Sequence, residues 1–233
     1  MHMPIPIGIS EVREIINLLS KPWHAFQGYR LLVFGSKGVG KTTLWRHLQD
    51  GDSVNASIST TLAPEEIGRF KLRDIKVAGL LRVRILGVDV PGDLSLRATW
   101  EDALCKMGPP PHGIIFMLDN VEDAEQGLPK TGYDPKRLEE HHEAFKHLSN
   151  LVLSNSNVMD TLQAMLILVN KSDSWGSGSL QYGDIIDAAG LDPFVTRFDK
   201  ELDARFRRRI QPCSALYGSN VQASVAWMAK NFQ

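Results

Sequence analysis

Apolar residues along the chain alternate between short continuous runs and helix-like spacing, a pattern typical of a parallel sheet covered by helices. Short β-prone or continuous apolar runs predict strands at residues 30–34, 67–77, 80–90, 114–118, 165–169 and 210–213. Apolar residues three and four positions apart predict helices at 9–19, 41–49, 135–153, 194–208 and 221–232. We therefore predict an α/β fold with a mostly parallel central sheet and helices on both faces.

The predicted strands differ in their place in the sheet. The runs at 114–118 and 165–169 are apolar throughout, so we expect both to lie in the middle of the sheet, where both faces are buried. The strands at 67–77 and 80–90 alternate apolar and polar residues and are joined by a turn at 78–79, which predicts an antiparallel hairpin.

The chain length of 233 residues fits a single domain. We place this domain at 29–233, after an N-terminal amphipathic helix and linker at 1–28. The apolar stripe of that helix favours packing on a core over lying on a membrane. The stretch 126–135 is rich in Gly, Pro and charged residues, which predicts a surface insertion.

Composition and charge narrow the setting of the protein. The 26 Lys and Arg against 27 Asp and Glu give a net charge of -1, which lacks the basic footprint of a nucleic-acid-binding protein. Two cysteines, Cys105 and Cys213, are too few for a disulfide framework and indicate a reducing, cytoplasmic setting. No apolar run approaches the roughly 20 residues that cross a bilayer. No lipidation motif encodes membrane association, so attachment at a membrane through a partner stays open.

A glycine-rich loop follows the first predicted strand of the domain. Its sequence, GSKGVGKT from Gly35 to Thr42, fits the pattern Gly, four residues, Gly-Lys-Ser/Thr, and a predicted helix follows it. Glycines let backbone N–H groups turn inward around phosphate oxygens, and the helix N-terminus adds a positive dipole end. We expect Lys41 to reach the β- and γ-phosphates and the Thr42 hydroxyl to bind Mg²⁺. The phosphate-binding residues we predict are Lys37, Gly38, Val39, Gly40, Lys41, Thr42 and Thr43.

The sequence Asn170-Lys171-Ser172-Asp173 directly follows a predicted buried strand. An ionised Asp173 carboxylate only accepts hydrogen bonds, so it matches the N1–H and N2–H₂ donors of guanine and not the edge of adenine. We expect Lys171 to lie along the base and Asn170 to tie this loop to the phosphate loop. Backbone N–H groups of Ser214 and Ala215, after the last strand, are predicted to reach guanine O6. GTP and GDP are therefore the expected ligands.

The sequence Asp89-Val-Pro-Gly92 ends another predicted strand. We expect Asp89 to hold Mg²⁺ through water and the Gly92 N–H to meet the γ-phosphate, which is how a mobile loop senses the nucleotide. A threonine from the segment between the first helix and the hairpin should complete the Mg²⁺ shell. Thr61 is preferred to Thr60, so the predicted metal ligands are Thr42, Thr61 and Asp89.

With these motifs in place, the chain resembles the Ras-like small GTPases, which share the P-loop NTPase fold, and it is most similar to the Arf family. The similarity extends over about residues 30–233. It is strongest at 89–100, where Arg97 and Trp100 stand at the spacing found in Arf-like proteins, and it includes 113–119 and the Ala226-Trp227 pair.

That resemblance implies a GTP-loaded state that binds effectors through the regions of Thr61 and Asp93, and a cycle driven by exchange and activating proteins. The sequence leaves open whether Leu94, Leu96 and Trp100 line a partner groove or fill space beneath the switch segment.

Two residues depart from the pattern of the family. Asp93 stands where these GTPases carry the Gln that orients the attacking water, and a carboxylate offers no N–H donor. Lys37 stands where Arf-like proteins carry Asp, and a solvated side chain is favoured there over a cation acting on the γ-phosphate. The catalytic residues expected are Lys41, Thr61, Gly92 and Asp93. We predict slow GTP hydrolysis without a partner, with a GTP-bound scaffold subunit as the alternative.

Overall fold

The computed structural model describes residues 29–50, 65–71, 84–106, 108–120, 133–175, 181–202 and 204–232. Several predictions lie outside these residues: the N-terminal helix at 9–19, Thr60 and Thr61, the turn at 78–79 and most of the insertion at 126–135. The described residues form an α/β fold, as the hydrophobic pattern predicted.

Six strands form one sheet in the order β2-β3-β1-β4-β5-β6. Their bounds are β1 Tyr29–Gly35, β2 Glu65–Lys71, β3 Arg84–Asp89, β4 Gly113–Leu118, β5 Ala164–Val169 and β6 Arg207–Pro212. β2 runs antiparallel to β3, as expected for the predicted hairpin, and the other neighbouring strands run parallel. β4 and β5 are buried along their whole length inside the sheet, which their continuous apolar runs predicted.

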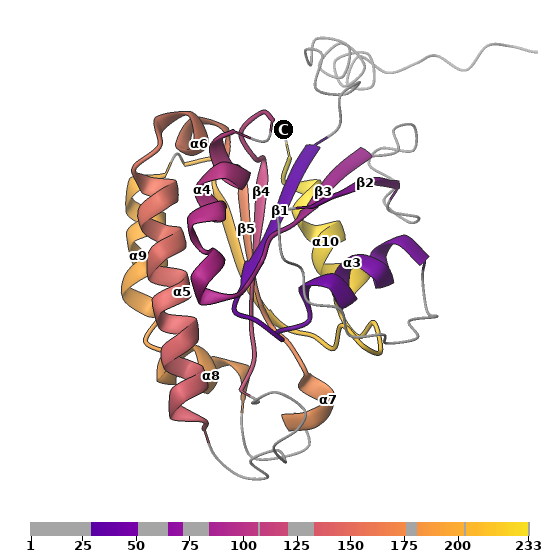
Figure 1. Ribbon diagram of the computed structural model, residues 1–233, viewed down its shortest axis with the longest axis vertical. Coiled ribbons are helices and arrows are strands. Elements are labelled where there is room, and N and C mark those ends of the chain that lie inside the picture. The colour runs from indigo at the N-terminus through magenta and orange to yellow at the C-terminus, as the bar shows by residue number, and fades with distance from the viewer. Residues whose placement is uncertain are drawn as a thin grey trace, which may run out of the picture.

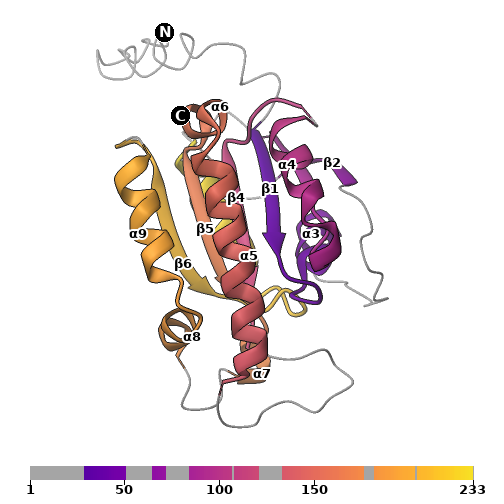
Figure 2. The ribbon, with the colours of Figure 1, turned by 60° about the vertical axis from the view of Figure 1, so that its left-hand side comes forward.

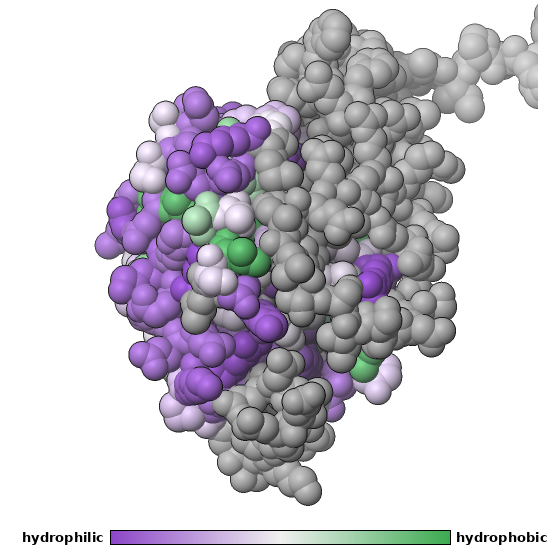
Figure 3. All heavy atoms as spheres, viewed as in Figure 1, coloured by the Kyte–Doolittle hydropathy of each residue, from purple (hydrophilic) through white to green (hydrophobic). Residues whose placement is uncertain are grey.

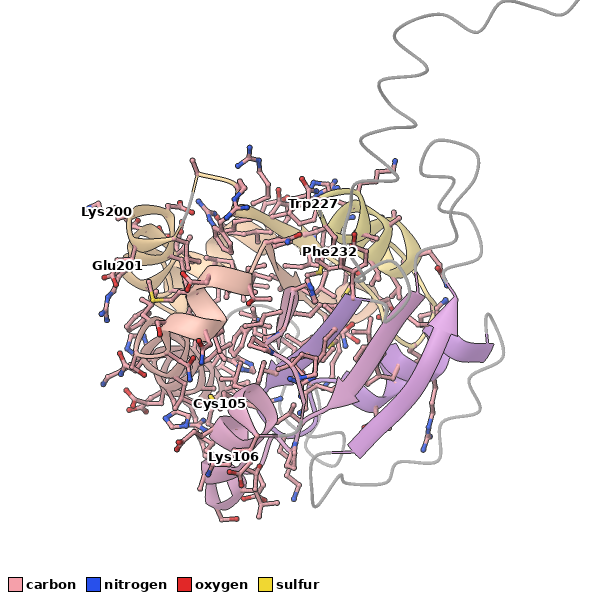
Figure 4. The ribbon with its side chains drawn as sticks, turned by 90° about the horizontal axis from the view of Figure 1, so that it is seen from above. Cys105, Lys106, Lys200, Glu201, Trp227 and Phe232 are labelled. Atoms are coloured by element: carbon pink, nitrogen blue, oxygen red, sulfur yellow. The ribbon has the colours of Figure 1, made fainter. Side chains whose placement is uncertain are left out.

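Helices cover both faces of this sheet (Figures 1 and 2). Their bounds are α3 Lys41–Asp50, α4 Ala98–Cys105, α5 Pro135–Leu153, α6 Ser156–Thr161, α7 Ser172–Trp175, α8 Tyr182–Ala188, α9 Asp192–Glu201 and α10 Val221–Lys230, and a 3₁₀ turn, η1, spans Leu94–Leu96. The helices α3 and α10 pack on one face, and α4, α5 and α9 pack on the other. Seen from above, Trp227 and Phe232 lie on the α10 side and Cys105 on the α4 side (Figure 4).

The predicted helix at 194–208 extends too far. The helix α9 ends at Glu201, and Arg207 begins the edge strand β6. The run of arginines hid the strand because it lacks the alternating apolar residues by which a half-buried strand is recognised. Two of these arginines have partners on neighbouring helices: Arg208 pairs with Asp199 of α9 at 2.7 Å, and the Arg209 guanidinium lies 5.8 Å from the ring centroid of Trp227 on α10.

The helices α5 and α9 form part of one helical layer, and their outer surface is one face of the protein (Figure 1). Figure 3 shows mostly hydrophilic side chains over the described part of this face, with only small hydrophobic areas between them. The apolar side chains of these helices point the other way, into the sheet. Among the described residues, no helix combines the length and apolar character that crossing a bilayer requires.

Phe145 of α5 lies at the centre of the core between α5 and the sheet. It is fully buried, and its ring centroid lies 4.7 Å from that of Phe116 on β4. We expect Phe145→Ala to lower the free energy of unfolding by about 3–5 kcal/mol, because it removes buried apolar surface and leaves a cavity. Urea unfolding followed by circular dichroism measures this change. The neighbouring substitution Lys146→Ala, at an exposed position, should stay within about 0.5 kcal/mol of the wild type. Equal effects of the two substitutions would contradict this packing.

Candidate functional site

The carboxyl ends of the parallel strands meet at one edge of the sheet, at the bottom of Figure 1. Polar loops leave the sheet there: the glycine-rich loop after β1, residues 119–120 after β4, residues 170–173 after β5 and residues 213–219 after β6. Ligands of open α/β sheets bind outside the carboxyl ends of the strands, so this edge is the candidate site.

The glycine-rich loop connects β1 directly to α3. Gly35, Gly38 and Gly40 have φ angles of 145°, 75° and 93°, which side-chain-bearing residues rarely adopt. A Cβ atom on Gly40 would come within 2.5 Å of Nδ2 of Asn170. Glycines therefore allow both the turn of this loop and its close approach to the loop after β5. Thr42 and Thr43 lie in the first turn of α3.

Lys41 places a buried cation inside this loop. Its Nζ atom donates to the carbonyl oxygens of Gly35 at 3.0 Å and Ser36 at 3.1 Å, and the residue is only 6% exposed. Gly92 packs directly against the same place: a Cβ atom there would come within 2.6 Å of Gly35 O and would also collide with Lys41. The phosphate loop, its lysine and the segment after β3 therefore converge on one point.

Asn170 joins three loops through its side-chain amide. Its Nδ2 donates to Val39 O at 2.7 Å, and its Oδ1 accepts from the Ala215 N–H at 2.8 Å. The first of these bonds is the tie to the phosphate loop that the sequence predicted. Lys171 follows with a φ of 59°, so the chain turns sharply here. Asp173 then lies exposed in the short helix α7. This helix lies at the same edge of the sheet as the phosphate loop (Figure 1).

The backbone N–H groups predicted to reach guanine O6 have partners inside the protein. Ala215 N donates to Asn170, and Ser214 N donates to Ser219 O at 3.1 Å. In this arrangement both N–H groups shape the loop after β6. A bond from either group to a base oxygen would have to replace one of these internal bonds.

Asp93 caps the turn that follows β3. Its Oδ1 accepts hydrogen bonds from the Ser95 N–H at 3.0 Å and the Ser95 hydroxyl at 2.7 Å. These two bonds hold the pKa of the Asp93 carboxyl below its usual range, so the group is ionised at neutral pH. Lys37 of the phosphate loop lies 4.0 Å away, with its side chain 54% exposed. The structure thus brings together the two residues at which the sequence departs from the family pattern.

The metal ligands predicted from sequence are described in part. Asp89 ends β3 opposite Val33 of β1, two residues before the phosphate loop. Thr42 lies on the neighbouring first turn of α3. Thr61 lies outside the described residues. The backbone therefore places Asp89 and Thr42 at the same edge of the sheet.

Trp100 fills space beneath the segment that contains Gly92. It is fully buried, its Nε1 donates to Pro91 O at 2.7 Å, and its ring centroid lies 5.0 Å from that of Phe34. Of the two alternatives that the sequence left open for Trp100, the structure therefore supports packing beneath this segment over lining a groove.

Sequence reasoning missed a buried charged cluster at this edge. Asp119, directly after β4, lies 2.7 Å from Nε of Arg137, 3.1 Å from Nε2 of His141 and 2.7 Å from Nζ of Lys171. Ser36 Oγ of the phosphate loop lies 3.2 Å from Nδ1 of His141. A signal was present, because an acidic residue follows a fully buried strand and an Arg and a His stand four positions apart on a helix. Such a pattern predicts a paired buried charge.

Burial and charge act against each other in this cluster. Burial alone would raise the pKa of Asp119, but the contact with His141 and the charges of Arg137 and Lys171 outweigh it and hold that pKa far below its usual range. Burial lowers the pKa of His141, and the charge of Arg137 lowers it further. Asp119 raises this pKa, but by too little to offset the burial. His141 is therefore neutral at pH 7. A proton on Nε2 lets His141 donate to Asp119 Oδ1 at 3.1 Å and leaves Nδ1 to accept from the Ser36 hydroxyl at 3.2 Å.

We expect the neutral, buried state of His141 to make stability depend on pH. The pKa of His141 in the folded protein lies below its ordinary value of about 6.5. As the pH falls below this value, the unfolded chain binds a proton that the folded chain does not, so the free energy of unfolding falls. The contribution is at most about 1.4 kcal/mol per pH unit. Urea titrations between pH 7 and pH 5 should show a shallower dependence for His141→Asn than for His142→Asn. Equal slopes for both variants would contradict this account.

The chain matches a known family along most of its length. The model of the ADP-ribosylation factor family matches residues 15–232. The chain is 26% identical over 204 residues to ADP-ribosylation factor-like protein alp41 of Schizosaccharomyces pombe, covering 88% of this chain and 86% of that protein. It is 23% identical over 219 residues to ADP-ribosylation factor-like protein 3 of Saccharomyces cerevisiae, covering 92% and 91%. Identity to ADP-ribosylation factor-related protein 1 of Rattus norvegicus is 23% over 210 residues, covering 87% and 84%. The protein therefore belongs to the ADP-ribosylation factor (Arf) family of GTP-binding small GTPases.

Proposed function

We propose that this chain binds GTP and GDP together with Mg²⁺ at the carboxyl edge of its sheet, and that it hydrolyses GTP slowly in the absence of a partner. Its Arf-family membership supports a GTP-binding switch. The observation that carries the proposal is the amide of Asn170, which holds the loop of Asp173 against the phosphate loop through Val39.

The phosphate loop binds the phosphates of the nucleotide. Its glycines take φ angles that turn backbone N–H groups toward a bound oxyanion. The ammonium of Lys41 is held by two carbonyl oxygens of the same loop. A triphosphate would replace these two neutral carbonyl acceptors with anionic phosphate oxygens, which attract the ammonium more strongly.

Base selection rests on Asp173. The residue is exposed at the site edge, where an ionised carboxylate accepts the paired N–H donors of guanine. Adenine presents an acceptor at the corresponding ring nitrogen, so binding it would place two acceptors face to face. Lys171, held by Asp119, fixes the direction in which the loop leaves β5.

The residues at this edge fit Mg²⁺ by their chemistry. Mg²⁺ prefers oxygen ligands and retains several waters, so one hydroxyl and one carboxylate beside a phosphate are enough to hold it. Thr42 and Asp89 supply this pair from the first turn of α3 and the end of β3, and Thr61 is the further ligand that we propose. When bound, the ion neutralises charge on the phosphates. The chain itself orients the γ-phosphate through Lys41 and the Gly92 N–H.

Asp93 limits the rate of hydrolysis. Its carboxylate is ionised and already accepts two hydrogen bonds from Ser95, so it donates no proton toward a developing negative charge. The ammonium of Lys37 lies 4.0 Å from the Asp93 carboxylate and partly balances its charge. We propose that an activating partner supplies the missing donor and that effectors contact the segment around Asp93. A cytoplasmic location, with attachment to a membrane through such a partner, fits this mode of action.

The first experiment tests base recognition. We expect isothermal titration of the purified protein with GTP and Mg²⁺ to give tight binding, with ATP at least about 100-fold weaker because a mispaired acceptor costs about 3 kcal/mol. Asp173→Asn should lose most of its preference for GTP, whereas Asp187→Asn, at an exposed position of α8, should retain it. Equal affinities of the wild type for GTP and ATP would refute the proposed function.

The second experiment tests the role of Asp93 in single-turnover hydrolysis. We expect Asp93→Gln to raise the rate about tenfold or more, a barrier change of about 1.4 kcal/mol, because its amide restores an N–H donor. Asp93→Leu removes the charge without adding a donor and should show no gain. If Asp93→Leu is as fast as Asp93→Gln, charge and not donor chemistry limits the wild type. A wild-type rate that neither variant exceeds would show that Asp93 is not limiting.

A further inference from the structure

Arg137 belongs neither to the phosphate loop, residues 35–42, nor to residues 170–173, the proposed guanine loop. It nevertheless contacts the phosphate loop directly. It lies in the first turn of α5, which Asp134 caps by accepting from the Arg137 N–H at 3.1 Å. The amino end of α5 lies at the same edge of the sheet as the phosphate loop (Figure 1). Its side chain is only 8% exposed, so the guanidinium must be paired within the protein.

The three arms of this guanidinium reach three different groups. Nε donates to Asp119 Oδ1 at 2.7 Å, Nη1 to Glu140 Oε2 at 3.0 Å and Nη2 to the carbonyl oxygen of Lys37 at 2.7 Å. The two carboxylates fix the plane of the guanidinium, and this plane directs Nη2 at the phosphate loop. A planar fork with five N–H donors can satisfy these groups at once.

The bond to Lys37 O sets the direction of a backbone N–H group. The peptide bonds of the described residues are trans, so the carbonyl of Lys37 and the N–H of Gly38 point in opposite directions across one plane. Because Arg137 comes from α5, this carbonyl points toward α5. The Gly38 N–H is thereby directed to the opposite side, toward the cradle for phosphate.

Asn170 makes the same kind of contact two residues further on. Its Nδ2 holds the carbonyl of Val39, which directs the Gly40 N–H in the same way. Two side chains from outside the loop therefore fix two of its peptide planes. The two contacts are also linked to each other, because Asp119 pairs with Arg137 through one oxygen and with Lys171, the neighbour of Asn170, through the other.

We propose that Arg137 is a positioning residue for nucleotide binding. It fixes the Lys37–Gly38 peptide plane so that the Gly38 N–H faces the phosphates beyond the α-phosphate. This inference rests on the proposed function. Asp119 orients Arg137 and at the same time holds Lys171, so the phosphate loop and the guanine loop are positioned by one shared carboxylate.

The test compares Arg137→Lys with the wild type in the full chain. Lysine keeps the positive charge beside Asp119 but lacks the planar fork that reaches Lys37 O. Competition binding with GDP and GMP, both with Mg²⁺, gives two affinities for each protein. We expect the affinity for GDP relative to GMP to fall about tenfold in Arg137→Lys, since small errors in position are costly at such sites. Because the ratio is independent of the fraction of folded protein, a merely structural role would leave it unchanged.

The matched control is Arg197→Lys. Arg197 of α9 pairs with Glu201 at 2.7 Å on the surface, and its partners among the described residues, Glu201 and Asn150, lie outside the proposed site. We expect its GDP-to-GMP ratio to equal that of the wild type. The ³¹P resonance of the β-phosphate of bound GDP should move in Arg137→Lys and not in Arg197→Lys. An unchanged ratio in Arg137→Lys would overturn this inference alone, whereas a wild type that binds neither nucleotide would overturn the proposed function.

Discussion

The side-chain amide of Asn170 is the contact on which the arrangement of the candidate site depends. It donates to the phosphate loop at Val39 and accepts from the loop after β6 at Ala215, so one residue sets the spacing of three loops. The residue is 3% exposed. Removing such an amide would leave buried backbone groups unpaired at a cost of about 1–3 kcal/mol each. The approach is close enough that only glycine fits at position 40.

Around this contact, the site is stabilised by buried charges that balance one another. Asp119 lies between Arg137 and Lys171. The neutral His141 contacts both Asp119 and Ser36, so it connects this group to the phosphate loop. Buried ion pairs add little net stability compared with apolar packing, but losing one partner is expensive. Such a cluster therefore favours one geometry over its alternatives. In this protein that geometry is the relative placement of the glycine-rich loop after β1 and the loop after β5.

The sheet and the two main motifs could be predicted from the sequence because each depends on local pattern. The apolar runs of β4 and β5 and the glycines of the phosphate loop have clear signatures, and α5 begins and ends at the predicted residues. β6 was placed too late because Arg207 to Arg209 are polar residues on a sheet edge, where packing on neighbouring helices decides. The roles of Arg137 and His141 depend on contacts about a hundred residues apart in the chain, which no local pattern contains. The partners of the Ser214 and Ala215 N–H groups likewise depend on tertiary structure.

Guanine recognition at the edge that Asn170 organises is the central claim, and the nucleotide carried by the protein tests it most directly. Protein purified without added nucleotide can be denatured in acid and the released compounds separated by ion-exchange chromatography. We predict about one mole of GDP or GTP per mole of protein, because Asn170 holds the guanine loop at a fixed distance from the phosphate loop. Release of adenine nucleotides, or reloading of the emptied protein by ATP as readily as by GTP, would contradict the account.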